Sequence, residues 1–123
     1  MFYTKQYQEA EAFAESVLLP GMRTKKVRLA VAVRLLYIKM ALYEDAEMIK
    51  QYYENEKEIL RFSGASEDYR SLYLYFKFIE KQPEEAEKFH ALWEKALEGQ
   101  EERDIAMEKE QVDFVGKKWG DAR

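Results

Sequence analysis

The residues best suited to metal chemistry are Glu87 and His90, which match the pattern Glu-x-x-His on a predicted helix. Helical proteins that bind paired metal ions use two such motifs together with further carboxylates. The chain has one His, so only a homodimer would supply a second motif. Phe89 and Trp93 place His90 beside an apolar stripe, where a boundary histidine needs no metal. We therefore predict no metal site and no cofactor.

Residues that could act as nucleophiles are also few. The chain has no Cys, and a serine nucleophile would need His90 as its general base. Nothing in the sequence brings a Ser near His90, and helix capping explains the three Ser at positions 63, 66 and 71. A Gly-rich phosphate loop is absent, and paired acid–base carboxylates cannot be singled out among 24 acidic residues. We predict that the protein has no catalytic residues, is not an enzyme and takes no small-molecule substrate.

A basic segment occupies positions 23–39, which carry six Lys or Arg and no acidic residue. A basic helix N-terminus can bind phosphate groups. The candidate contacts to an anion or a nucleic acid are Arg23, Lys25, Lys26, Arg28 and Lys39. Residues 80–110 carry 5 basic and 11 acidic side chains, so they offer an internal partner of opposite charge. The sequence leaves open whether the basic segment binds nucleic acid or the acidic helices of the same chain.

Arg34 belongs to the same segment but lies in an unusual place for a charged side chain. On a helix it shares an angular range with the apolar residues Val27 and Ile38. A charge within an apolar stripe is costly unless it is paired. We predict a buried ion pair between Arg34 and a carboxylate of residues 84–110 or of a partner chain. A side chain that packs its stem and reaches an acidic group at the surface is the alternative.

The element that must position these basic residues is the stretch 24–62, which contains no Gly or Pro. Its apolar residues recur at three- and four-residue steps in two stripes, one including Val27 and the other Tyr43. We predict one long central helix with Thr24 as its N-cap and a bend or break near 44–45. Residues 27–33 also alternate as in a strand, but their Ala content and the strong helix formers that follow favour a helix.

Further helices are predicted on both sides of the central stretch. A helix over residues 4–19 ends at Pro20–Gly21. After a stop at Gly64, Ser66 is the predicted N-cap of a helix over 67–81. Pro83 is well placed to start a helix that ends at Gly99. The last segment, 100–115, is highly charged and only weakly amphipathic, and Gly residues follow it.

The helix predicted over residues 67–81 is the most aromatic part of the chain. Its apolar face is wider than one neighbouring helix can cover, which suggests a contact with another protein. A thin apolar stripe in the C-terminal segment ends at Trp119, which is a further candidate for this contact. The predicted partner interface consists of Tyr73, Tyr75, Phe78 and Trp119.

Composition sets the class of protein. An apolar content of 47% supports a folded core, and the low counts of Pro (2) and Gly (5) favour a few long helices. The sequence predicts an all-α antiparallel bundle of four to five helices around a long central helix. Residues 1–123 form a single helical domain, in which 100–123 is a loosely docked C-terminal segment. The N-terminus lacks signal-peptide features and the longest apolar block is too short to span a bilayer, so we predict no membrane contact and a cytoplasmic location.

These observations favour a function that depends on contacts with other molecules rather than on catalysis. We predict a non-enzymatic helical adaptor or small structural subunit that works through protein–protein contacts. A protein partner or self-association places it in an oligomer or a larger assembly. The alternative from another class is a nucleic-acid-contacting helical subunit that uses the basic segment Arg23–Lys39.

Overall fold

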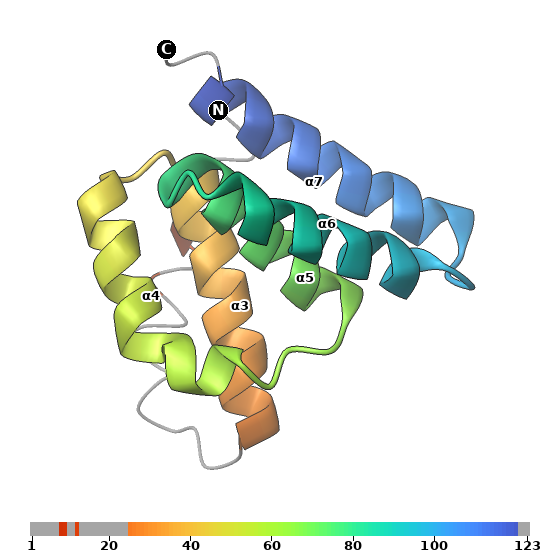
Figure 1. Cartoon of the computed structure of the whole chain (residues 1–123), viewed down its shortest axis with the longest axis horizontal. Helices are drawn as coiled ribbons and strands as arrows, with labels where there is room; N and C mark the ends of the chain where they lie inside the picture. Colours follow the sequence, from red (N-terminus) through yellow and green to blue (C-terminus); the bar gives the residue numbers. More distant parts are fainter. Residues whose placement is uncertain (1–7, 10–11, 13–24, 121–123) are drawn as a thin grey trace. The chain divides into compact units, whose positions relative to one another are not determined.

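The computed structural model describes residues 8–9, 12 and 25–120, and 84% of them are helical, with no strand among them (Figure 1). This confirms the all-α class and excludes the strand alternative for residues 27–33. Of the predicted helix over 4–19, the structure describes only residues 8–9 and 12, which are helical, and the predicted N-cap Thr24 lies outside the described residues. The helices are α3 (Lys25–Ala41), α4 (Ala46–Leu60), α5 (Ser66–Leu74), α6 (Pro83–Leu97) and α7 (Glu102–Gly120), and the π-helix η2 (Tyr75–Ile79) continues α5.

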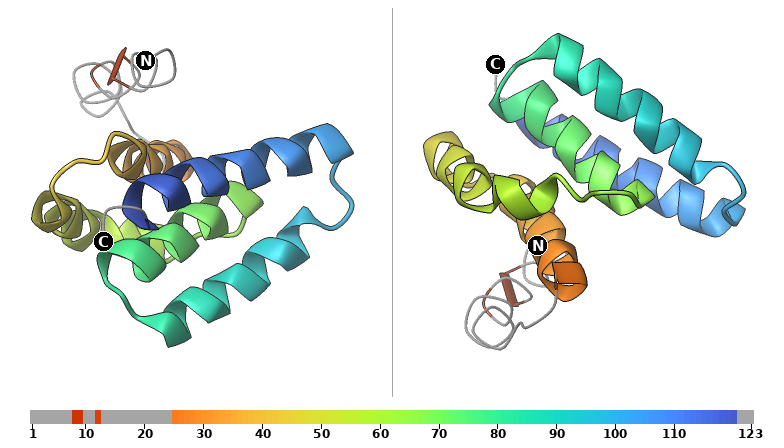
Figure 2. Two further views of the ribbon diagram at one scale, coloured as in Figure 1. Left: turned by 90° about the horizontal axis from the view of Figure 1, so that it is seen from above. Right: turned by 60° about the horizontal axis from the view of Figure 1, so that its bottom comes forward.

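The chain divides into two compact units, residues 1–63 and 64–123. In the first unit, α3 and α4 lie side by side and run in opposite directions (Figure 1). In the second unit, α5 contacts both α6 and α7 (Figure 2). That the whole chain forms a single domain stays a prediction. No helix in the described part of the chain is long and apolar enough to cross a membrane.

The predicted break near residues 44–45 is confirmed, and it is sharper than a bend. α3 ends at Ala41, Tyr43 has a left-handed φ of 56°, and α4 starts at Ala46. The chain therefore reverses, and the described part of the stretch 24–62 forms two helices in place of one continuous helix. The physical reason is that α3 and α4 each carry an apolar stripe. The reversal lets Tyr52 of α4 pack against the buried Leu35 of α3, whereas one straight helix would hold these two residues far apart.

The start of α5 is capped by the carboxylate of Asp68. Asp68 Oδ2 accepts hydrogen bonds from the backbone N–H of Gly64 at 2.9 Å and of Ala65 at 3.0 Å. Ala65 occupies the N-cap position, and Ser66 is already helical, so the prediction of Ser66 as N-cap is wrong. The Asp68 charge also lies where the helix dipole favours an anion. The Ser66 hydroxyl therefore does not cap the helix and can form hydrogen bonds to other elements.

The aromatic helix ends in a π-helix. The N–H of Glu80 donates to the carbonyl of Tyr75 at 3.1 Å, a five-residue step, and Lys81 then turns the chain with φ 55°. Tyr75 and Phe76 are both buried, although they are adjacent in sequence. Pro83 starts α6 as predicted.

α6 and α7 are joined by a short loop at Gly99. Gly99 has a φ of 84°, and the N–H of Gln100 donates to the carbonyl of Leu97 at 3.1 Å. The predicted end of α6 at Gly99 is confirmed. α7 continues through Gly116 to Gly120, beyond the predicted limit at 115.

Gly99→Ala is expected to lower the free energy of unfolding by about 1 kcal/mol, because a side chain is disfavoured in the left-handed region. Denaturant titration followed by circular dichroism measures this change. Gly64→Ala is the matched control, since Gly64 has no positive φ and open space at its Cβ position. Equal midpoint shifts for the two variants would contradict the assigned backbone conformation.

Candidate functional site

Three helices of the second unit meet at a buried polar cluster. The Glu108 carboxylate of α7 is only 4% exposed and accepts hydrogen bonds from Ser66 Oγ of α5 at 2.7 Å and Trp93 Nε1 of α6 at 3.0 Å. Gln100 Nε2 donates to Ser66 Oγ and to the carbonyl of Ala96, both at 3.0 Å. The cluster therefore ties α5, α6 and α7 together.

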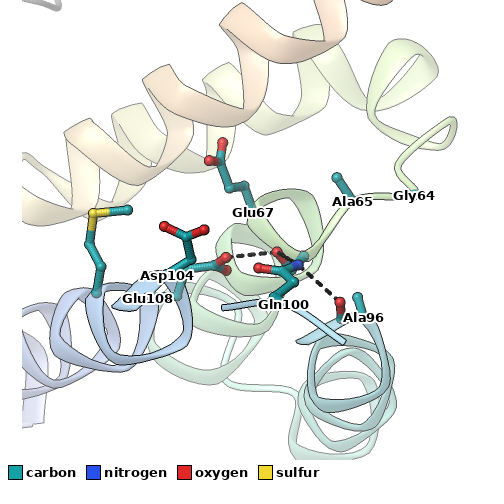
Figure 3. A pocket seen from close by; sticks show the side chains of 9 residues that line it. Gly64, Ala65, Glu67, Ala96, Gln100, Asp104 and Glu108 are labelled. Atoms are coloured by element: carbon teal, nitrogen blue, oxygen red, sulfur yellow. Dashed lines mark hydrogen bonds between the residues drawn. The ribbon is translucent and has the colours of Figure 1, made fainter. Parts of the chain in front are cut away.

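An open hollow of about 490 Å³ lies beside this cluster (Figure 3). Its charged lining consists of the carboxylates Glu67, Asp104 and Glu108, and the exposed apolar residue Met107 also lines it. The hollow is therefore acidic and has no basic residue in its lining. Among the described residues, no group of His, Cys, Asp and Glu is arranged to hold a metal ion.

Sequence reasoning missed the pairing of Ser66 with Glu108. It considered only His90 as a base for serine, whereas Ser66 Oγ donates to a carboxylate 42 residues away. Ser66 is buried, and its oxygen also accepts from Gln100. These hydrogen bonds hold the Ser66 hydroxyl between helices, so they connect the helices and have a structural role. No local spacing in the sequence signals a contact over this separation.

His90 lies at the edge of a smaller hollow of about 240 Å³ that Tyr73, Lys77 and Pro83 help to line. His90 Nδ1 is 2.9 Å from the carboxylate of Glu94, which follows it by one helical turn. The partner of His90 is therefore not the Glu87 of the Glu-x-x-His pattern.

Part of the predicted partner interface is used inside the second unit. Tyr75 is fully buried and its hydroxyl donates to Glu80 Oε1 at 2.7 Å, so the prediction that Tyr75 faces a partner is wrong. Tyr73 is half-buried and stacks on Trp93 of α6, with ring centroids 6.2 Å apart and planes inclined by 10°. The physical reason is that η2 carries Tyr75 inward while α6 covers the neighbouring rings.

The rest of the seam between α5–η2 and α6 is also aromatic. Phe76 stacks on Phe89 with centroids 5.5 Å apart, and the Tyr73 ring meets His90 edge-on at 4.8 Å. Phe78 and Trp119 are half-buried, and their role in a partner interface stays a prediction.

The basic segment is partly neutralised within the first unit. Arg28 Nη2 lies 3.2 Å from Oε2 of the buried Glu56 in α4, and Lys39 Nζ lies 3.7 Å from Glu44 Oε1. Both cations therefore have carboxylate partners within the first unit. Lys25 and Lys26 begin α3, and Arg23 lies outside the described residues.

Arg34 is exposed, so the prediction that its side chain is buried in an ion pair is wrong. Its neighbours Val33 and Leu35 are buried at 1% and 0% exposure, whereas Val27 and Ala30, which share its side of α3, are exposed. Ile38, one turn after Arg34, is buried at 8% exposure, so the burial on this side of α3 does not extend over Arg34 itself.

Arg34→Ala is expected to change the free energy of unfolding by less than about 0.5 kcal/mol, the usual range for an exposed site. Denaturant titration measures the change, and Leu35→Ala in the same turn is the positive control because Leu35 is fully buried. A loss for Arg34→Ala as large as that for Leu35→Ala would restore the buried-pair hypothesis.

Several large apolar side chains remain at the surface of the described chain. Sequence reasoning assigned Val27 and Tyr43 to helix stripes that pack on neighbours, but both are about half exposed. Phe62 lines an open hollow of about 340 Å³ beside Arg28 and Arg61. The exposed large apolar residues are Val27, Tyr43, Met48 and Phe62 in the first unit and Met107 in the second.

Comparison of the chain with protein-family models, with curated proteins and with solved structures finds no match.

Proposed function

We propose that the protein is a non-enzymatic helical adaptor or small structural subunit that acts through protein–protein contacts. The observation that carries the proposal is the exposure of two large apolar side chains of the first unit, Met48 in α4 and Phe62 just after its end. Met48 is 66% exposed and Phe62 is 50% exposed, although α3 and α4 bury many smaller apolar side chains. Methionine and aromatic residues are enriched in protein interfaces because they bury a large apolar area with an adaptable or rigid shape.

The polar cluster at Glu108 supports the non-enzymatic part of the proposal. The Glu108 carboxylate accepts from Ser66 and Trp93, and the Ser66 hydroxyl also accepts from Gln100. Buried polar groups that satisfy one another across helices stabilise a fold. The Glu108 carboxylate and the Ser66 hydroxyl would have to break these hydrogen bonds before either could act on a substrate.

The alternative, a nucleic-acid-contacting subunit that uses residues 23–39, has less support. Phosphate contacts gain affinity when a cation replaces condensed counterions on the nucleic acid. Arg28 and Lys39 already have carboxylate neighbours in Glu56 and Glu44, so part of their charge is compensated before any ligand binds.

The adaptor proposal is tested by sedimentation velocity over a wide concentration range and by cross-linking to partners from the native host. We expect self-association or a specific partner, and we expect the double variant Met48→Ser with Phe62→Ser to abolish it. Met107→Ser is the matched control, because Met107 is an exposed methionine of the other unit. A monomer at every concentration that captures no partner would refute the proposal.

Fluorescence anisotropy with single- and double-stranded oligonucleotides at low salt distinguishes the alternative. The adaptor proposal predicts no binding. Binding that weakens steeply with salt, and that is lost when Lys25, Lys26 and Arg28 are changed to Glu, would establish the nucleic-acid function instead.

A further inference from the structure

The two helix interfaces of the second unit differ in chemistry. α5 and η2 meet α6 through stacked rings, including Phe76 on Phe89 and Tyr73 on Trp93. In contrast, the buried residues of α7 are Glu108 and Val115, of which only Val115 is apolar, although the helix is 19 residues long. α7 is therefore held by less apolar burial than the seam between α5 and α6.

Glu108 and Gln111 of α7 form side-chain hydrogen bonds to α5 and α6. Glu108 accepts from Ser66 and Trp93, and Gln111 Oε1 accepts from Arg70 Nη1 one turn later. A hydrogen bond within a protein replaces one to water, so its net contribution is only about 0.5–1.5 kcal/mol. An interface whose buried centre is polar opens more readily than one built on aromatic rings.

The hollow of about 490 Å³ weakens the docking of α7 further. Its lining includes the carboxylates of Glu67 in α5 and of Asp104 and Glu108 in α7, and no basic residue (Figure 3). The hollow is also open to solvent, so water can compete for the hydrogen bonds of the cluster.

The connection to α6 provides a place for α7 to turn. α6 ends at Leu97, α7 starts at Glu102, and Gly99 lies between them with φ 84°. Glycine absorbs changes in φ and ψ at little cost, and such short loops serve as hinges.

We infer that α7 is a displaceable strap, which opens as a unit about Gly99 while α5, η2 and α6 stay packed. Opening uncovers the Ser66 hydroxyl and the edge of Trp93, the two groups that Glu108 covers. The device goes beyond the adaptor function and does not depend on it, because it concerns only contacts within the second unit. It gives the protein two states whose balance a ligand or a modification of α7 would shift.

Hydrogen–deuterium exchange of the full chain, read by mass spectrometry, tests the strap. The amides of 102–120 should exchange at least about tenfold faster than those of α5 and α6, because local opening precedes global unfolding. Glu108→Ala should speed exchange in α7 by a further tenfold or so, since tenfold corresponds to about 1.4 kcal/mol and two hydrogen bonds are lost. Exchange in α5 and α6 should stay unchanged.

Glu110→Ala is the matched control, because Glu110 is an exposed residue of the same helix. Its exchange pattern should equal that of the unchanged protein. If Glu108→Ala does not fold, Ser66→Ala removes one of the two bonds and should give a smaller rise confined to α7. Equal exchange rates in α5, α6 and α7 of the unchanged protein, or a variant that accelerates all three together, would show one cooperative unit and overturn the inference.

Discussion

Tyr75→Ala should lower the free energy of unfolding by about 3–5 kcal/mol, the usual cost of removing a buried aromatic ring. Tyr75 is fully buried, its ring meets Phe76 edge-on with centroids 5.3 Å apart, and its hydroxyl donates to Glu80. The variant loses this packing, leaves a cavity and removes the donor to Glu80. Since small proteins are stable by about 5–15 kcal/mol in total, the variant should be markedly unstable in denaturant titration.

Two companion variants separate the causes of the Tyr75 effect. Tyr75→Phe keeps the ring and removes only the hydroxyl, so the expected loss is about 1 kcal/mol. Met48→Ala truncates an exposed side chain and should change stability by less than about 0.5 kcal/mol. If Tyr75→Ala were as mild as Met48→Ala, Tyr75 would lie at the surface, as the sequence had predicted.

Trp93→Ala is the second variant with a large expected effect, a loss of about 3–5 kcal/mol. Trp93 is 3% exposed, stacks on Tyr73, and donates from Nε1 to Glu108 at 3.0 Å. The substitution opens the seam between α5 and α6 and removes one of the bonds that hold α7. Circular dichroism during denaturant titration measures the loss without relying on tryptophan fluorescence.

Trp93→Phe separates packing from hydrogen bonding. It keeps an apolar ring in the seam but leaves Glu108 with only Ser66 as a donor, so we expect a loss of about 1–3 kcal/mol. In a double-mutant cycle with Glu108→Ala, the two changes should be non-additive because they remove the same bond. Strict additivity would show that Trp93 and Glu108 do not interact in solution.

The amino-acid sequence by itself determined the helical class and most of the places where helices start or stop. Pro83 at a helix start, the end of that helix at Gly99 and the break near residues 44–45 are all borne out by the structure. These features are decided within a few residues, by the fixed φ of proline, the freedom of glycine and the period of apolar residues. Local physics of this kind can be read without knowing where any helix lies in space.

Only the tertiary structure decided which side chains meet. Ser66 and Glu108 are 42 residues apart and Arg28 and Glu56 are 28 apart, and nothing in their local spacing selects these partners. A polar group that is buried must find a partner, but which one it finds depends on how the chain reverses between helices. The burial of Tyr75 has the same cause. A wide aromatic face has the same sequence pattern whether a partner protein or α6 covers it. In the structure, the π-helix η2 turns the Tyr75 ring into the core of the chain itself.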